Sequence, residues 1–194
     1  MANNEKKLRG RIIIIEGNIS AGKTTLCLRL RDQLGCKVFL EPTLTNPFLE
    51  EFYKNPKEFA LRMQLWLLRQ RFRTYVDAVL ESIKNGESVV LDRSVFSDWV
   101  FAEQGRRDGV ISPEGFDYYK KIRESILCHL PKPDFAIYLQ VEPDVCHYRI
   151  HELRKRDCES GIPVDYLNGL HKCYENFITN LSENGTTKTL TYDW

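Results

Sequence analysis

The stretch EGNISAGKTT, residues 16–25, decides how the rest of the chain is interpreted. It comes directly after the apolar run Ile12–Ile15 and overlaps the start of Lys23–Leu34, where leucines recur at helical spacing. Such a short, continuous apolar run is typical of a strand buried on both faces. Within the stretch, Gly17, Gly22 and the Lys-Thr pair that follows fit the pattern G-x-x-x-x-G-K-[ST]. A strand, a glycine-rich turn and a helix in this order predict a phosphate-binding loop.

The chemistry of this loop follows from its backbone and from two polar side chains. Glycines allow the N–H groups to turn inward around phosphate oxygens, and the N-terminus of the following helix attracts the anion. Lys23 is expected to reach the β- and γ-phosphates, and the Thr24 hydroxyl is expected to bind Mg²⁺. The alternative, a glycine-rich turn with a chance lysine, is disfavoured by the flanking strand and helix. The residues expected to hold the nucleotide phosphates are Gly17, Asn18, Ile19, Ser20, Ala21, Gly22, Lys23, Thr24 and Thr25.

Length and composition restrict the class of protein. With 194 residues, 42% of them hydrophobic and 28% charged, the chain is expected to form one domain over residues 1–194, with residues 1–10 flexible. The net charge of +1 argues against nucleic acid as a partner, and no apolar stretch is long enough to span a membrane. The polar N-terminus lacks a signal-peptide pattern, so a cytoplasmic protein is expected. The six cysteines form no C-x-x-C pair and are interpreted as reduced thiols.

Strand and helix patterns alternate along the chain. This alternation predicts an α/β fold of the P-loop NTPase type, in which a five-stranded parallel sheet carries helices on both faces. Ligands bind such sheets at the C-terminal ends of the strands, so the residues just after each strand are candidates for function. The expected strands are Ile12–Ile15, Cys36–Leu40, Ser88–Leu91, Asp134–Val141 and Lys188–Tyr192. The expected helices are Lys23–Leu34, Lys57–Lys84, Glu114–Leu130, Pro143–Leu153 and Pro163–Leu181.

Charged residues follow the second and third expected strands. Glu41, next to Pro42, is interpreted as a general base for an acceptor hydroxyl; the alternative is an exposed loop carboxylate. Asp92 is interpreted as part of a Mg²⁺ shell, and Arg93 as a clamp on phosphate or transition-state charge. The alternative for this pair is a surface ion pair in which Asp92 caps a helix. The phosphate-binding loop favours the functional interpretation.

The long expected helix carries a polar stripe. Gln64 and Arg71 are seven residues apart and lie nearly on one face, with Leu67 and Leu68 between them. A glutamine amide presents a donor and an acceptor together, which matches the edge of a nucleobase. The alternative is a solvated flank of the helix.

A basic segment follows the fourth expected strand. Arg149, Arg154 and Arg156 are interpreted as a short arginine-rich lid that closes over a triphosphate. The alternative is a charged helix end that interacts favourably with the helix dipole. His147 and His151 have the spacing of helical metal ligands, but no third ligand is evident, so they are interpreted as surface histidines.

Together these motifs resemble the deoxynucleoside kinase family. GNISAGKTT is similar to the family's G-N-I-x-x-G-K-[ST], Glu41-Pro42 to its E-P motif, and Asp92–Asp98 (DRSVFSD) to its [DE]-R-S-x-[FY]-x-[DA]. Arg154–Glu159 resembles the lid motif R-G-R-x-x-E, with Lys155 in the place of the glycine. The segment Asn46–Gln64 resembles the bacterial deoxyadenosine and deoxyguanosine kinases. The likeness covers nearly the whole chain.

The resemblance implies roles for individual residues. Glu41, Arg93 and Lys23 are expected to be catalytic, with Glu41 as the base that acts on the 5′-hydroxyl. Tyr53 and Glu159 are expected to hold the 3′-hydroxyl. The expected deoxynucleoside contacts are Glu41, Tyr53, Gln64, Arg71, Arg93, Asp98, Glu159 and Phe101, the last by stacking on the base. Arg149, Arg154 and Arg156 are expected to grip the donor phosphates of ATP, and Thr24 and Asp92 to hold Mg²⁺.

The implied activity is transfer of the γ-phosphate of ATP to the 5′-hydroxyl of a deoxynucleoside in nucleotide salvage. A charged Arg71–Asp98 pair would crowd a thymine methyl group, so deoxyadenosine, deoxyguanosine or deoxycytidine is expected over thymidine. The alternatives are a broad, thymidine-accepting kinase, a nucleoside monophosphate kinase, and an ATP-binding switch or module without a small-molecule acceptor. By resemblance alone, the protein is expected to be a homodimer.

Overall fold

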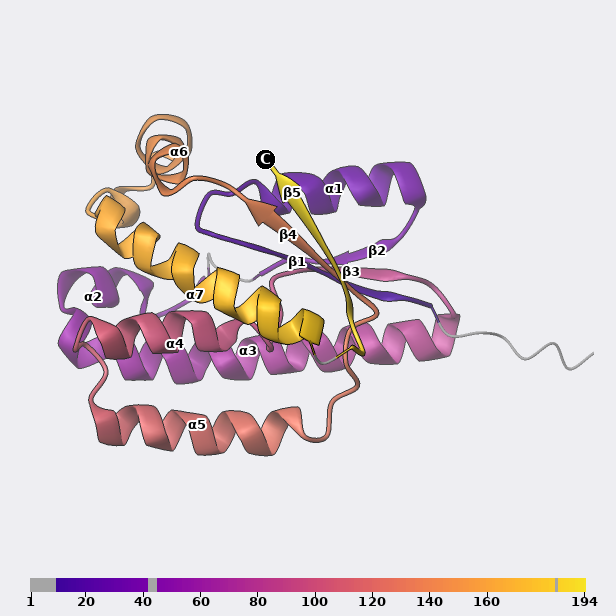
Figure 1. The fold of residues 1–194 in the computed structure, drawn as a ribbon, viewed down its shortest axis with the longest axis horizontal. Coiled ribbons are helices and arrows are strands. Elements are labelled where there is room, and N and C mark those ends of the chain that lie inside the picture. The colour runs from indigo at the N-terminus through magenta and orange to yellow at the C-terminus, as the bar shows by residue number, and fades with distance from the viewer. Residues whose placement is uncertain (1–9, 42–44, 184) are drawn as a thin grey trace, which may run out of the picture.

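The computed structural model describes residues 10–41, 45–183 and 185–194 and shows a five-stranded parallel sheet (Figure 1). The strands lie in the order β2-β3-β1-β4-β5, so β1 is central. Every neighbouring pair is parallel; Ile14, for example, is in register with Leu91 on one side and Ala136 on the other. The strands are β1 (Ile12–Gly17), β2 (Lys37–Phe39), β3 (Val89–Asp92), β4 (Phe135–Gln140) and β5 (Lys188–Asp193). The predicted α/β sheet is confirmed.

The apolar run in β1 is buried on both faces of the sheet, as its composition predicts. Ile12 and Ile14 belong to the core beneath the long helix α3, whereas Ile13 and Ile15 pack in a second core on the α1 face. In Figure 1, α1 covers one face, and α3, α4 and α7 cover the other, with α5 outermost. The helices are α1 (Lys23–Leu34), α2 (Leu49–Lys54), α3 (Pro56–Asn85), α4 (Asp98–Arg107), α5 (Pro113–Leu127), α6 (Pro143–Tyr148) and α7 (Val164–Glu183).

Local sequence sets the ends of the helices that position the site. Helix α3 starts at Pro56, whose missing N–H costs nothing in the first turn, and it ends at Gly86, which adopts φ 68°. Helix α5 starts after Ser112, whose Oγ accepts a hydrogen bond from the Gly115 N–H at 3.1 Å. No helix among the described residues is long and apolar enough to cross a membrane.

The structure differs from the sequence-based expectation in three places. The short helices α2 and α4 were not predicted, because their apolar residues are too few or too clustered to show a helical period. The helix expected over Pro143–Leu153 stops at Tyr148, and Arg149–Arg154 forms a π-helical turn. A 3₁₀ turn follows at Asp157–Glu159. The expected strand at Cys36–Leu40 is shortened to β2, and Pro42 lies outside the described residues.

Candidate active site

The C-terminal edge of the sheet carries a large cavity of about 810 Å³. The phosphate-binding loop forms one wall, and Arg149, Arg154 and Arg156 form another. The structure therefore places the three lid arginines around the same space as the loop. Trp194, which belongs to none of the sequence motifs, also lines this cavity, and its backbone carbonyl accepts a hydrogen bond from Arg149.

Two glycines of the loop are required by geometry. Gly17 and Gly22 have φ values of 148° and 92°. A Cβ atom on Gly17 would approach the Leu139 carbonyl oxygen to 2.8 Å, and one on Gly22 would approach the Trp194 indole nitrogen to 2.7 Å. Larger side chains at these positions would both strain and displace the loop.

Asn18 connects the loop to helix α7. Its Nδ2 donates to the Leu167 carbonyl at 2.9 Å, and its Oδ1 accepts from the Ile19 N–H at 2.8 Å. The side chain is almost fully buried. The asparagine of the G-N-I opening thus fixes the loop against a distant helix, which a general phosphate-loop pattern does not require.

Lys23 and Thr24, at the start of α1, each contact a neighbouring oxygen of the site. The Lys23 Nζ donates to the Asn18 carbonyl at 2.6 Å. Burial, reinforced by the Arg93 charge, lowers the pKa of Lys23 to about 8. The Thr24 hydroxyl contacts the Asp92 carboxylate. This hydroxyl and this carboxylate are the oxygen ligands that Mg²⁺ accepts alongside substrate phosphates.

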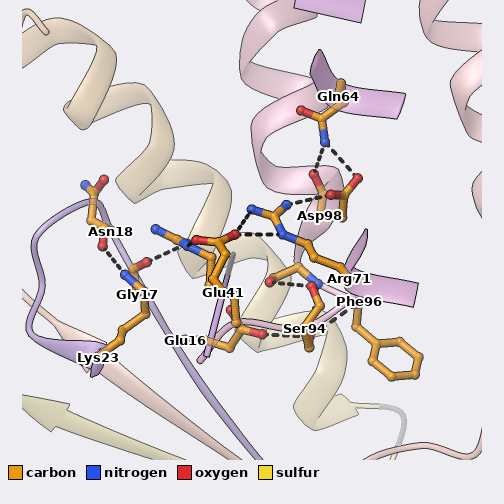
Figure 2. Close-up of polar contacts among 12 residues, drawn as sticks. Glu16, Gly17, Asn18, Lys23, Glu41, Gln64, Arg71, Ser94, Phe96 and Asp98 are labelled. Carbon is orange, nitrogen blue, oxygen red and sulfur yellow. Dashed lines mark hydrogen bonds and ion pairs between the residues drawn. The ribbon is translucent and has the colours of Figure 1, made fainter. Parts of the chain in front are cut away.

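Glu41 is held by two arginines (Figure 2). Arg71 Nε donates to its Oε1 at 3.0 Å, and Arg93 Nε lies 3.2 Å from its Oε2. Burial alone would raise the pKa of Glu41, but the charges of Arg71 and Arg93 outweigh burial and lower the pKa to about 2. Glu41 is therefore a fixed anion at neutral pH and not an exposed loop carboxylate.

Arg93 has an unusual backbone and several partners. Its φ of 67° lies in the left-handed region, and its guanidinium donates to the Gly17 carbonyl at 2.9 Å and contacts the Tyr174 hydroxyl. Tyr174 was not predicted; it lies on α7, some eighty residues along the chain, and no local pattern connects it to Arg93. Arg93 thus joins the phosphate-binding loop, Glu41 and helix α7.

The polar stripe on α3 faces inward, not toward solvent. Gln64 and Arg71 are 2% and 6% exposed, which removes the solvated-flank alternative. Both contact Asp98 at the start of α4 (Figure 2). Gln64 lines a cavity of about 320 Å³, and Arg71 lines a smaller one of about 80 Å³.

These two smaller cavities share one wall. Tyr53 and Phe101 line both. The Arg93 guanidinium lies 4.7 Å from the centre of the Phe101 ring. Glu159 lines the smaller cavity, 3.0 Å from Arg154 Nε. The structure thus brings the residues expected to hold the sugar and the base around two adjoining cavities, except for Asp98, which is fully buried and lines neither.

The lid motif departs from its pattern at Lys155. Lys155 adopts φ 47°, in the left-handed region that glycine favours. Arg154 and Arg156 flank it and both pair with Glu159. His147 and His151 lie with ring centres 4.1 Å apart, and the described residues contain no cluster of three metal-ligating side chains.

Glu16 is a buried acid to which the sequence motifs assign no role. It is fully buried in β1, and its Oε1 accepts from the Ser94 hydroxyl at 2.7 Å (Figure 2). Its Oε2 has no hydrogen-bond partner among the described residues. Burial raises the pKa of Glu16 to about 7, although Ser97, Ser94 and Arg93 partly oppose the shift.

Glu16→Gln is expected to stabilise the protein at pH 8 by up to about 3 kcal/mol and to leave it nearly unchanged at pH 5. The pKa is raised in the folded state, so the favourable contribution of the protonated acid is complete below pH 4.5 and is lost as the pH rises through 7. Denaturant unfolding at both pH values measures this. A gain of equal size at both, or in the exposed control Glu87→Gln, would contradict it.

Comparison with known proteins places this chain in a family. A model of the family "Deoxynucleoside kinase" matches residues 13–193. The chain is 52% identical to a deoxyguanosine kinase of Dictyostelium discoideum, over 95% of this chain and 64% of that protein. It is 29% identical to bovine NADH dehydrogenase (ubiquinone) 1 alpha subcomplex subunit 10, over 90% of this chain and 57% of that protein. The chain thus spans less than two thirds of the length of either relative.

A solved structure agrees with the sequence comparisons. Deoxyadenosine kinase from M. mycoides with bound dCTP superposes with a TM-score of 0.81 at 26% identity, covering 94% of this chain and 89% of that chain. The family match extends over nearly all of the sheet and of the residues around the cavities. The chain therefore belongs to the deoxynucleoside kinase family.

Proposed function

We propose that this protein transfers the γ-phosphoryl group of ATP to the 5′-hydroxyl of a deoxynucleoside, with a purine deoxynucleoside preferred. One observation carries the proposal: Glu41, Arg93 and Arg154 line both the large cavity at the phosphate-binding loop and the small cavity beside Tyr53 and Phe101. A donor in the first cavity and an acceptor in the second would meet at Glu41. This is the arrangement that in-line transfer requires.

Each charged group has a defined task in this mechanism. Glu41 accepts the proton of the 5′-hydroxyl, and Arg93 stabilises the negative charge of the transferred phosphoryl group. Lys23 and the lid arginines Arg149, Arg154 and Arg156 neutralise the donor phosphates. The Arg149–Arg154 turn and the residues after it would close over the cavity. Closure would exclude water and limit hydrolysis of ATP.

The site also fits a magnesium ion. Thr24 and Asp92 would hold it, since their oxygens already lie in contact at the edge of the large cavity. When bound, Mg²⁺ supplies neutralisation of charge on the donor phosphates.

The preference for the base rests on Arg71 and Asp98. The two side chains form a buried ion pair, 2.5 Å from Arg71 Nη1 to Asp98 Oδ1, and a charged pair at this position would crowd a thymine methyl group. The relatives named deoxyguanosine kinase and deoxyadenosine kinase support purines. Deoxyguanosine, deoxyadenosine and deoxycytidine are therefore expected over thymidine.

Two rival functions are disfavoured by the charges. A nucleoside monophosphate kinase needs free cations for the acceptor's phosphate, but the arginines described around the small cavity pair with Glu41 or Glu159. The name of the bovine relative suggests a second rival, a non-catalytic role as a subunit of a larger complex. Such a role would not require Glu41 as a buried anion between two arginines at the junction of two cavities.

A panel of acceptors with labelled ATP and Mg²⁺ tests the proposal. The panel contains deoxyguanosine, deoxyadenosine, deoxycytidine, thymidine, dGMP and thymidine monophosphate. Label is expected in the nucleosides, with thymidine slowest by about tenfold or more, the cost of a steric clash of 1–3 kcal/mol. Preferential labelling of the monophosphates, or hydrolysis of ATP without any acceptor, would contradict the proposal.

The homodimer and the cytoplasmic location stay predictions. Light scattering on the purified protein measures the first, and fractionation of cells that produce it measures the second.

A further inference from the structure

Asp98 is the centre of a buried hydrogen-bond cluster at the base end of the site. It is fully buried, and its Oδ1 accepts from Arg71 at 2.5 Å. Its Oδ2 accepts from Gln64 Nε2 and from the Tyr119 hydroxyl, both at 2.7 Å. Three donors from two helices, α3 and α5, thus fix the orientation of one carboxylate on α4.

This cluster fixes the polarity of the Gln64 amide. Its Nε2 carries two hydrogens, and it donates to both Asp98 Oδ2 and the Asp98 carbonyl, the latter at 3.0 Å (Figure 2). The reversed amide would place Oε1 against two acceptor oxygens. Gln64 therefore offers a ligand only Oε1, which accepts hydrogen bonds.

Tyr119 holds this arrangement from outside the cavities. It belongs to α5, the outermost helix in Figure 1, and it lines none of the three cavities described above. Its ring is fully buried against Phe116. Burial raises the pKa of Tyr119, so its hydroxyl remains protonated and donates to Asp98 throughout the neutral range.

We propose that Tyr119 is a specificity-determining residue, which by fixing Asp98 makes Gln64 an acceptor and, among the purines, selects bases whose N1 carries a hydrogen. This inference rests on the proposed function. It identifies a positioning residue, because Tyr119 acts on the base through Asp98 and Gln64 and does not touch the substrate.

The donor and acceptor patterns of the bases decide which of them fit. Guanine and hypoxanthine present N1–H to the Gln64 Oε1, with the adjacent O6 available to Arg71. Adenine N1 and cytosine N3 are acceptors, so each would face Gln64 Oε1 with no donor between them. Arg71 can serve O6, because its bonds to Glu41 and Asp98 use three of the five N–H groups of its guanidinium.

Deoxyinosine and deoxyadenosine provide the sharpest comparison, because they have the same ring system and differ only in the C6 substituent and the N1 hydrogen. The wild-type protein is expected to favour deoxyinosine in kcat/KM by about tenfold or more, the usual effect of leaving a buried polar group unpaired. Equal values, or a preference for deoxyadenosine, would overturn the inference.

Tyr119→Phe removes only the hydroxyl. It is expected to lower the deoxyinosine to deoxyadenosine ratio by about threefold or more, because Asp98 loses one donor and the Gln64 amide can turn. Most of the change is expected in KM. Tyr118→Phe is the matched control, since Tyr118 is 56% exposed on the same helix and should leave the ratio unchanged.

The ratio separates specificity from stability. A variant that is merely less stable loses both activities equally and keeps the wild-type ratio. If Tyr119→Phe behaves in this way, the inference is overturned. An equal change of the ratio in Tyr118→Phe would also overturn it. If the wild-type protein phosphorylates neither these two nucleosides nor any nucleoside of the acceptor panel, the proposed function fails. Dissociation constants of the two nucleosides, measured calorimetrically on the same three proteins, then give the ratio that decides the inference.

Discussion

Glu41→Gln is expected to lower kcat by about 10²- to 10⁴-fold, the range in which general bases contribute to catalysis. Glutamine has nearly the shape of glutamate, and its Oε1 can still accept from one of the two arginines. Its Nε2 cannot accept from the other, and the amide cannot take the proton of a 5′-hydroxyl. The dissociation constant of the deoxynucleoside is expected to stay within about fivefold of wild type, since the loss of one hydrogen bond costs about 1 kcal/mol. Initial rates and equilibrium binding measure the two quantities separately.

The pKa of Glu41 gives this prediction a second measurable consequence. Because folding lowers that pKa from 4.5 to about 2, Glu41 stabilises the folded protein above pH 4.5, and this contribution is lost as the pH falls through 2. Glu41→Gln should remove this acid-dependent loss of stability. Glu50→Gln, which breaks only an exposed pair with Lys54, is the control. Wild-type turnover in Glu41→Gln would exclude Glu41 as the base.

Several parts of the site could be predicted because their signals are local. The phosphate-binding loop is contiguous, and Glu41 and Asp92 could be placed because parallel strands bring their C-terminal ends to one edge. The buried strand β1 was recognisable because four adjacent isoleucines cannot all face one side of a sheet. These inferences required only the order of residues and the geometry of strands.

Other parts depend on contacts between distant segments and could not be predicted. Tyr174 and Tyr119 are ordinary aromatic residues of amphipathic helices until α7 and α5 are packed against Arg93 and Asp98. The π-helical turn at Arg149–Arg154 has no counterpart in helical periodicity, which gave one continuous helix instead. Glu16 is the first residue of the stretch EGNISAGKTT, but its burial and its hydrogen bond with Ser94 become visible only in the folded structure.

Burial decided between the alternatives that periodicity left open. The sequence pattern of α3 is equally compatible with Gln64 and Arg71 on a solvated flank and with both in a base-binding pocket, because a helix of this length can have a solvated face and a buried face. The structure distinguishes them through α4, which places Asp98 between the two side chains. Because α4 was not predicted, the sequence of α3 alone could not show whether Gln64 and Arg71 are solvated or buried.

Lys23→Met is expected to lower kcat by about 10²- to 10³-fold or more while making the folded protein more stable. The ammonium group offers its charge to the developing negative charge on the transferred phosphoryl, and a thioether cannot replace it. Without nucleotide, however, the charge is buried beside Arg93, and the pKa of Lys23 falls from 10.5 to about 8. Burial of this charge opposes folding at neutral pH.

The stability gain is expected to be about 1–2 kcal/mol at pH 7, which is smaller than the pKa shift alone implies because the Asn18 carbonyl loses its donor. The sign follows from linkage: a lysine with a lowered pKa destabilises fully below about pH 8, and the penalty disappears as the pH rises to 10.5. The melting temperatures of the wild type and Lys23→Met should therefore converge above pH 10.

Lys172→Met is the matched control for this substitution, because Lys172 lies exposed on α7 and should change neither turnover nor melting temperature. A Lys23→Met protein that is less stable than the wild type at pH 7 would show that the lysine serves the fold. Loss of activity together with a gain in stability would instead show that the phosphate-binding loop retains a buried charge at the expense of the folded state, because the reaction needs it there.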